Sequence, residues 1–268
     1  MILIRDLVKE IEGQAILRGI SLEVANGETL VIIGRSGGGK SVMLKHIIGL
    51  MAPTSGHIEI DGQEIIGLSE RNLASVRKKV GILFQSGALF DSMTVEENVA
   101  FPLREAGEKD PKVLTARARE LLEVVGLSGH EHKMPVNISG GMKKRVALAR
   151  AMISNPSCIL YDEPTAGLDP VVSDSINRLI RRLQKRFHVT SIVVTHDMKS
   201  AAHIADRIAY LHEGRIYFQG TPQELENSPD PLIQDFIIGR SRELEEEMAR
   251  AVANAANTSS GARRSRRV

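Results

Sequence analysis

The stretch GRSGGGKS, Gly34 to Ser41, decides the fold of this 268-residue chain. It fits the pattern G-x-x-x-x-G-K-[ST] at every fixed position, stands at the end of the apolar run ETLVIIG (28–34) and opens the helical pattern KSVMLKHIIGL. Glycines here let successive backbone N–H groups wrap phosphate oxygens, while Lys40 reaches the β- and γ-oxygens and the Ser41 hydroxyl binds Mg²⁺. The sequence therefore predicts a phosphate-binding loop made of Gly34, Arg35, Ser36, Gly37, Gly38, Gly39, Lys40 and Ser41.

Apolar runs that end in polar residues alternate with helical patterns along much of the chain. CILYDEP (158–164) and SIVVTHD (191–197) resemble the run before the loop, as expected of buried parallel strands. This alternation predicts an α/β fold, a P-loop NTPase core whose ligand-binding groups collect at the carboxyl ends of the strands. Between the two runs, apolar residues at helical spacing predict a helix over 173–186 whose buried face holds Ile176, Leu179, Ile180 and Leu183.

Two regions depart from this alternation. The first 30 residues and HIEIDGQEI (57–65) are typical of antiparallel strands. Residues 87–157 have almost no strand pattern but contain helical stretches at 115–125 and 139–154. We therefore predict an N-terminal antiparallel β-subdomain, and an α-helical subdomain of about 87–157 inserted into the core.

Polar residues at the ends of predicted strands complete a candidate hydrolysis site. Asp162 and Glu163 are adjacent acids, which repel each other unless a cation lies nearby. Asp162 suits the shell of Mg²⁺, and Glu163 is placed to polarise an attacking water. His196 follows another strand and can donate a hydrogen bond to the γ-phosphate, while Gln85 ends the run VGILFQ. We expect catalytic roles for Lys40, Gln85, Glu163 and His196, and a metal bound by Ser41, Gln85 and Asp162.

The stretch NISGGMKKR (137–145) offers a second anion site in the same chain. Ser139 can cap a helix, and Gly140 and Gly141 let the backbone approach a ligand closely. A helix start favours negative charge through its unpaired N–H groups and its dipole. The chain thus carries two phosphate-binding motifs, one more than a single nucleotide site requires.

The composition, 42% hydrophobic and 25% charged, is that of an ordinary globular protein. Four arginines lie in the final RRSRRV, and removing their charges from the formal net charge of +2 leaves −2, which argues against a nucleic-acid partner. The one cysteine, Cys158, opens a predicted strand, so we expect a small buried hydrophobe in a reducing compartment. MILIRDLVKE lacks the features of a secretory signal, and no apolar run approaches about 18 residues. These features predict a cytosolic chain.

In their order along residues 1 to about 225, these motifs resemble those of the ATP-binding subunits of ABC transporters. The matching stretches are GRSGGGKS, Gln85, ISGGM, ILYDEP, AGLD and His196, and ISGGM is similar to the family's LSGGQ signature. The resemblance implies an ABC ATPase domain over 1–238 that binds ATP and Mg²⁺ and forms a head-to-tail homodimer. In that dimer Ser139, Gly140 and Gly141 of one copy contact the γ-phosphate held by the phosphate-binding loop of the other, which accounts for two anion sites per chain.

One position departs from the family's pattern. ABC ATPases usually have an aromatic residue near the first strand that stacks on adenine, and the corresponding residue here is Ile11. An aliphatic side chain can cover the base but cannot stack on it. We therefore expect ATP as the nucleotide, with looser base selectivity.

Within the family, LFQSGALF (83–90), NVAFPLRE (98–105), SGGMKKR (139–145) and NSPDPLIQDFI (227–237) resemble ATPases of the Mla-type, MCE-associated phospholipid transport systems of diderm bacteria. The resemblance implies a polytopic permease, an MCE-domain protein and, in some members, a STAS-domain protein as partners, at the cytoplasmic face of the inner membrane. An importer ATPase for amino acids or another small solute stays open as the alternative.

The stretch SGALF also predicts where the permease docks. The small residues Ser86, Gly87 and Ala88 leave a groove, and Leu89 and Phe90 give it an apolar edge. Such a groove suits a short helix of a membrane subunit.

Two other classes of ATPase fit the sequence less well. A relative acting on nucleic acid or ribosomes would have long coiled coils or two cassettes, and a module that only binds ATP would not need Glu163 and His196. Beyond 238 we predict a C-terminal helix at about 240–254, followed by a basic, disordered tail. For RRSRR in that tail, solvation is favoured over contact with anionic lipid.

Overall fold

The computed structural model describes residues 1–239. Its elements, in chain order, are β1 (Ile2–Ile11), β2 (Gln14–Val24), β3 (Thr29–Ile33), α1 (Lys40–Ile47), β4 (Ser55–Ile60), β5 (Gln63–Glu64), α2 (Glu70–Arg77), β6 (Val80–Leu83), α3 (Val95–Glu105), α4 (Pro111–Val124), the 3₁₀ turn Pro135–Asn137, α5 (Gly140–Met152), β7 (Cys158–Asp162), α6 (Pro170–Phe187), β8 (Thr190–Thr195), α7 (Met198–Ile204), β9 (Arg207–His212), β10 (Arg215–Gly220), α8 (Pro222–Glu226) and α9 (Pro231–Ile238).

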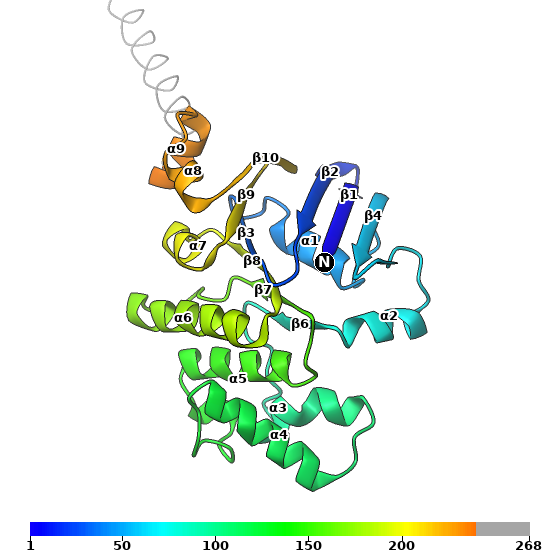
Figure 1. The fold of residues 1–268 in the computed structure, drawn as a ribbon, viewed down its shortest axis with the longest axis vertical. Coiled ribbons are helices and arrows are strands. Elements are labelled where there is room, and N and C mark those ends of the chain that lie inside the picture. Colours follow the sequence, from blue (N-terminus) through cyan, green and yellow to red (C-terminus); the bar gives the residue numbers. More distant parts are fainter. Residues whose placement is uncertain (240–268) are drawn as a thin grey trace, which may run out of the picture. The chain divides into compact units, whose positions relative to one another are not determined.

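A six-stranded sheet with the order β10-β9-β3-β8-β7-β6 forms the centre of the fold (Figure 1). Strands β9, β3, β8, β7 and β6 run parallel, and only β10 is antiparallel to its neighbour. Every residue of β3 and β8 is buried, because helices cover the sheet and leave no face for polar side chains. The predicted strands at 28–34, 158–164 and 191–197 are confirmed as β3, β7 and β8, and their parallel order brings the ends of all three to one edge.

A second, antiparallel sheet has the order β2-β1-β4-β5 and contains the predicted N-terminal strands. It shares one hydrophobic core with the central sheet and α1, in which Ile4, Ile58, Met43 and Leu160 are almost fully buried. Both β3 and α1 contribute side chains to this core. The loop that joins them is therefore anchored at both of its ends.

Between Gly87 and Ser157 the chain forms helices and no strand. The predicted helices at 115–125 and 139–154 are present as α4 and α5, and both pack with α3 in the lower part of Figure 1. Helix α3 begins with a capping box, in which Thr94 accepts from the backbone N–H of Glu97 and the Glu97 carboxylate accepts from that of Thr94. The boundaries 87–157 of an inserted helical subdomain stay a prediction.

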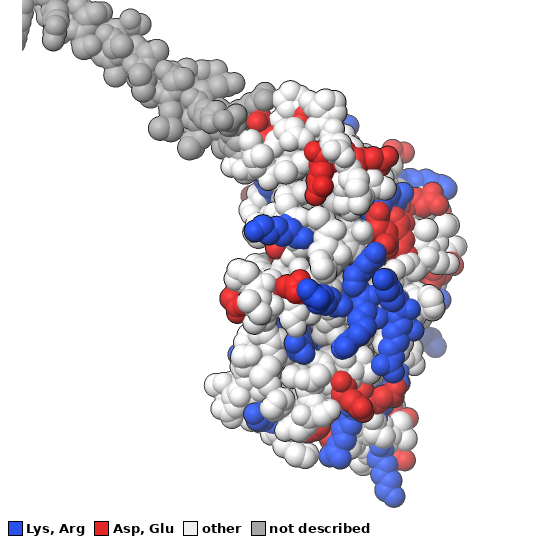
Figure 2. Space-filling model, turned by 60° about the vertical axis from the view of Figure 1, so that its left-hand side comes forward, with Lys and Arg blue, Asp and Glu red and all other residues white. Residues whose placement is uncertain are grey.

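Helix α6 is strongly amphipathic, as predicted. Its apolar stripe is buried, with Leu179 the most exposed member at 4%. Its outer face is basic, and Figure 2 shows a band of Lys and Arg side chains at the height of this helix, flanked by acidic side chains. Two of its arginines are paired, Arg178 with Asp174 and Arg181 with Asp206, both at 2.7 Å. The exclusion of a nucleic-acid partner stays our prediction.

Cys158 is buried at the start of β7, as predicted, and burial raises the pKa of its thiol. The described part of the chain divides into two units, Met1–Pro222 and a second that begins at Gln223. Within the second, α9 is capped by Asp230, whose carboxylate accepts from the N–H of Leu232 at 2.8 Å. The predicted domain boundary at 238 stays a prediction, and the predicted helix at 240–254 and basic tail lie outside the described residues. Among residues 1–239, no helix has the length and hydrophobicity that crossing a membrane requires.

Buried His46 should make the fold sensitive to acid. Burial lowers the pKa of His46, although a 2.7 Å hydrogen bond from Nδ1 to the Met51 carbonyl opposes this shift. Between about pH 6.5 and its lower folded-state pKa, His46 is therefore protonated in the unfolded chain but neutral in the folded chain. Stability falls as the pH drops from there through the folded-state pKa, by up to about 1.4 kcal/mol per pH unit.

The measurement is the urea unfolding midpoint between pH 7.5 and 5. In His46→Gln the acid-dependent fall of the midpoint should be smaller than in the unchanged chain. The matched control is His57→Gln, since the His57 side chain is 70% exposed. An equal fall of the unfolding midpoint with pH in all three proteins would contradict the role assigned to His46.

Candidate active site

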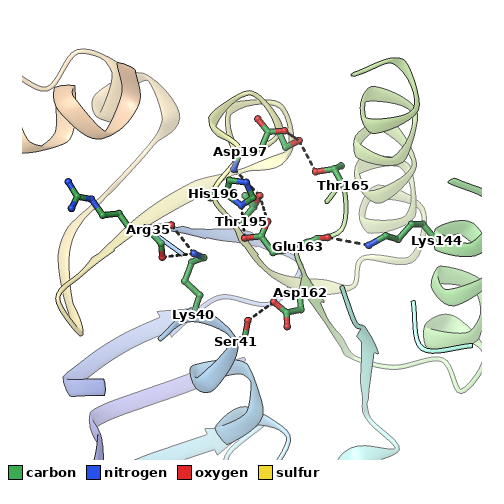
Figure 3. A network of polar contacts seen from close by, with 12 residues as sticks. Arg35, Lys40, Ser41, Lys144, Asp162, Glu163, Thr165, Thr195, His196 and Asp197 are labelled. Atoms are coloured by element: carbon green, nitrogen blue, oxygen red, sulfur yellow. Dashed lines mark hydrogen bonds and ion pairs between the residues drawn. The ribbon is translucent and has the colours of Figure 1, made fainter. Parts of the chain in front are cut away.

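The predicted phosphate-binding loop is the connection between β3 and α1, so its position between a strand and a helix is as expected. The Lys40 ammonium folds back over the loop and donates to the carbonyls of Gly34 at 2.7 Å and Arg35 at 3.0 Å (Figure 3). Burial lowers the pKa of Lys40, while the nearby charges of Glu163 and Asp162 raise it. A cation that water solvates poorly favours an anionic ligand, so the loop is suited to a phosphate group.

Two glycines of the loop are required for different reasons. Gly39, the N-cap of α1, has φ 95°, and a Cβ there would lie 2.9 Å from Leu17 Cδ2. Gly34 has no such backbone conformation, but its Cβ would lie 2.5 Å from the carbonyl oxygen of Leu211 at the end of β9. Gly39 therefore shapes the anion cradle, whereas Gly34 allows β3 and β9 to approach each other.

Asp162 lies at the end of β7, where its carboxylate Oδ1 accepts from the Ser41 hydroxyl at 2.8 Å. This pair joins α1 to the central sheet and sets two oxygen atoms side by side. Oxygen ligands are those that Mg²⁺ prefers, and the ion commonly completes its shell with phosphate oxygens and water. The pair fits a nucleotide-bound Mg²⁺. Among the described residues, no group of three or more His, Cys, Asp or Glu side chains is placed to hold a metal ion by itself.

Glu163 is held at every polar atom. Its φ is 47°, a left-handed backbone that is uncommon for glutamate. Its N–H donates to the Val194 carbonyl at 2.9 Å. Its carboxylate accepts from the Thr195 hydroxyl and contacts His196 Nδ1, both at 3.0 Å. The side chain is only 11% exposed and has little freedom to move, which is what a base aimed at one water requires.

One cavity of about 370 Å³ brings together all the residues for which catalytic roles are expected, Lys40, Gln85, Glu163 and His196. It lies where parallel strands end, the usual position of ligand sites in such sheets. Asp162 adjoins it through its bond to Ser41. The cavity is lined by Ser36, Gly37, Gly39, Lys40, Ser41, Val42, Gln85, Glu163 and His196.

The second phosphate-binding motif is not part of that cavity. Ser139 caps α5 as predicted, its hydroxyl accepting from the Met142 N–H at 3.3 Å. Neither Ser139 nor Gly140 nor Gly141 lines the cavity, and Ile11, 38% exposed at the end of β1, does not line it either. Within one chain, the two phosphate-binding motifs therefore do not line the same cavity.

Sequence reasoning missed Lys144 and Thr195. The Lys144 ammonium is buried and donates to the carbonyls of Gln85 at 2.5 Å and Glu163 at 3.2 Å. One signal was present: Lys144 occurs at helical spacing from Gly141 and Leu148, among the buried residues of α5. A lysine in that stripe indicates a buried polar contact, because burying an unpaired charge is costly.

Comparison with known proteins agrees with this geometry. The sequence profile of a family described as "ABC transporter" matches residues 17–166, more than half of the chain. The chain is 40% identical over 237 residues to the "Probable ribonucleotide transport ATP-binding protein mkl" of Mycobacterium leprae (strain TN), covering 88% of this chain and 68% of that protein. It is also 40% identical over 252 residues to "Protein TRIGALACTOSYLDIACYLGLYCEROL 3, chloroplastic" of Arabidopsis thaliana, covering 88% and 72%.

A third relative is the "Methionine import ATP-binding protein MetN" of Carboxydothermus hydrogenoformans, 39% identical over 253 residues, with coverage of 92% and 75%. Among solved structures, the fold is similar to "Dimeric structure of a post-hydrolysis state of the ATP-binding cassette MJ0796 bound to ADP and Pi". The TM-score is 0.76 at 33% identity, covering 83% of this chain and 99% of that one. This chain belongs to the ABC transporter family, as an ATP-binding subunit that hydrolyses ATP.

Proposed function

We propose that this chain drives a transporter of phospholipid between membranes, as a head-to-tail homodimer on a polytopic permease. The apolar groove beside Gln85, described below, is the observation that carries the link to a permease. We further propose the residue roles at the site: Gly34 to Ser41 bind the phosphates, and Lys40 neutralises the β- and γ-oxygens. Ile11 covers the base.

The hydrolytic step follows from the way Glu163 is held. Its carboxylate accepts a proton from the attacking water, while His196, in contact with the same carboxylate at 3.0 Å, donates to the γ-phosphate from its other ring nitrogen. Thr195 keeps the second carboxylate oxygen in place. Ser41, Gln85 and Asp162 would hold Mg²⁺, which supplies charge neutralisation between the β- and γ-phosphates.

The position of Ser139 supports a composite site. The serine–glycine turn has the chemistry of an anion site but lies outside the cavity that contains Lys40. In a head-to-tail dimer, Ser139, Gly140 and Gly141 of one copy meet the γ-phosphate bound by the other, so ATP bridges the copies and its hydrolysis releases them. The solved structure of MJ0796, whose title calls it dimeric, supports this arrangement.

A groove of about 450 Å³ lies next to Gln85 and supports docking of the permease. Ala88 and Phe90 line it, as does Phe101, whose ring centroid lies 4.6 Å from that of Phe90. Arg150 fixes the loop by donating to the carbonyls of Gly87 at 2.7 Å and Ala88 at 2.6 Å. A short amphipathic helix of a membrane subunit fits a groove that is apolar and rigidly edged.

The proposal of a phospholipid substrate rests on sequence resemblance to other ATPases. One of the four stretches that resemble Mla-type ATPases, 83–90, contains Phe84, Ala88 and Phe90, which line the groove. The Arabidopsis relative is named after a galactolipid. The proposal includes an MCE-domain protein, in some systems a STAS-domain protein, and a position at the cytoplasmic face of the inner membrane. The names of the MetN relatives favour the second candidate, an importer ATPase for amino acids or another small solute.

The test is purification of the tagged full-length chain from membranes, with identification of its partners and bound lipid. We expect a permease, an MCE-domain protein and phospholipid. Recovery of a permease with a solute-binding protein, without an MCE partner, would instead establish the importer.

The groove is tested in the same experiment. Phe90→Asp places a charge on the apolar edge, so recovery of the permease should fall at least tenfold while the isolated chain keeps its ATPase activity. Tyr217→Asp is the matched control, since Tyr217 is similarly exposed (47%) on β10 and outside the groove. Full recovery of the permease with Phe90→Asp would exclude this docking site.

A further inference from the structure

The geometry points to Lys144 as a positioning residue that fixes the backbone of Gln85 and Glu163 for ATP hydrolysis. This inference rests on the proposed roles of those two residues. It adds to them a group that lies outside the nucleotide cavity and that no motif of the chain assigns to the site.

Lys144 joins three segments that are distant in sequence. It lies in α5 and is 5% exposed, and its ammonium donates to carbonyls 59 residues back, at Gln85, and 19 residues on, at Glu163. Figure 3 shows the side chain reaching from its helix toward the Glu163 backbone. The loop after β6 and the end of β7 are therefore tied to one amine.

The bond to Glu163 completes the restraint of that residue. Its N–H and both carboxylate oxygens are bound by Val194, Thr195 and His196, all from β8 or the residue after it. Its carbonyl accepts from the N–H of Ala166 in the following turn and from the Lys144 ammonium, both at 3.2 Å, so Lys144 adds a bond from a helix. A left-handed backbone at glutamate persists only where the surroundings hold it, and Lys144 holds it from the side that the sheet does not reach.

Burying a lysine side chain at position 144 costs folding free energy, because the ammonium loses its hydration. Burial lowers the pKa of Lys144, and the charges of Asp162 and Glu163 raise it. A methionine of similar length would pack there without that cost. The ammonium, however, has three donors and can hold two carbonyls at once, which no apolar side chain does.

Helix α5, which contains Lys144, also begins next to Ser139 of the proposed composite site. Ser139, its N-cap, lies five residues before Lys144, or about 7.5 Å along the axis. Ser139 and the lysine that binds the Glu163 carbonyl therefore stand on the same helix. The residue that meets the partner's nucleotide in the proposed dimer is thus linked to the base of its own chain.

The test is steady-state ATPase kinetics of the full chain with Lys144→Met. We expect kcat to fall at least tenfold with KM for ATP within twofold of the unchanged chain, because the phosphate-binding loop is untouched while Glu163 is misplaced. Lys144→Gln, whose amide also donates, should recover most of the lost kcat. Lys143→Met is the matched control, because the side chain of this neighbouring lysine of α5 has no hydrogen bond or ion pair to the described residues 1–239, and it should match the unchanged chain.

Thermal unfolding of all three variants separates positioning from folding. A fall in kcat with an unfolding temperature near that of Lys143→Met supports the inference. If Lys144→Met does not fold, Lys144→Gln decides: a folded protein with kcat above one third of the original supports the donor role, and a folded but inactive one overturns it. Unchanged kcat in Lys144→Met, or a loss expressed only in KM, also overturns it. An unchanged chain that hydrolyses no ATP would instead contradict the assigned activity itself.

Discussion

Lys40→Ala is expected to lower ATP hydrolysis by on the order of 100- to 1000-fold, the usual effect of removing one charged donor from a transition-state site. The ammonium lies in the cavity with Glu163 and His196, and within residues 1–239 no other lysine or arginine lines that cavity. Its hydrogen bonds to Gly34 and Arg35 also stabilise the loop in the absence of nucleotide. Affinity for ATP should therefore fall together with turnover.

The measurement combines steady-state hydrolysis with equilibrium binding of a fluorescent ATP analogue. Lys45→Ala is the matched control, because Lys45 lies on the same helix but is exposed to solvent. Turnover by Lys40→Ala within a few-fold of the Lys45→Ala value would reject the assignment of the phosphate-binding loop.

Glu163→Gln is expected to separate binding from hydrolysis. The amide keeps the size of the side chain and can still contact Thr195 and His196, but it cannot take a proton from water. Loss of a general base lowers the rate by on the order of 100- to 10,000-fold. Because the γ-phosphate persists, the proposed bridge between two copies persists with it, and ATP should trap a dimer.

Size-exclusion chromatography with light scattering, with and without ATP, measures this effect. Glu105→Gln makes the same chemical change at an exposed site at the end of α3 and should behave like the unchanged chain. A Glu163→Gln protein that binds ATP yet stays monomeric would contradict the composite site, and one that still hydrolyses ATP would contradict the role of the base.

Much of this site could be read from the sequence because its groups stand at strand ends. Parallel strands expose their carboxyl ends at one edge, so Lys40, Asp162, Glu163 and His196 had to lie near one another once β3, β7 and β8 were recognised. The predicted cap of α5 was equally local, since Ser139 accepts from the N–H of Met142, three residues on.

The remaining features depend on contacts between distant segments. The left-handed conformation of Glu163 has no sequence signature, because it results from bonds to β8 and α5 rather than from the residue itself. Lys144 reaches Gln85 only because α5 packs against β6. The groove also differs from the prediction, because its lining comes from several segments. Ala88 and Phe90 line it as predicted, but Ser86, Gly87 and Leu89 do not, and α3 contributes Phe101.

The close approach at Gly34 bears on how this motif is conserved over evolutionary time. A side chain at position 34 would strike the Leu211 carbonyl, whatever the loop binds. Gly34 is therefore required by the sheet even in a homologous chain that no longer hydrolyses ATP. Gly39 is constrained in a similar way by its φ of 95° and by Leu17, so of Gly34, Gly39 and Lys40 only the lysine reports on the ancestral chemistry.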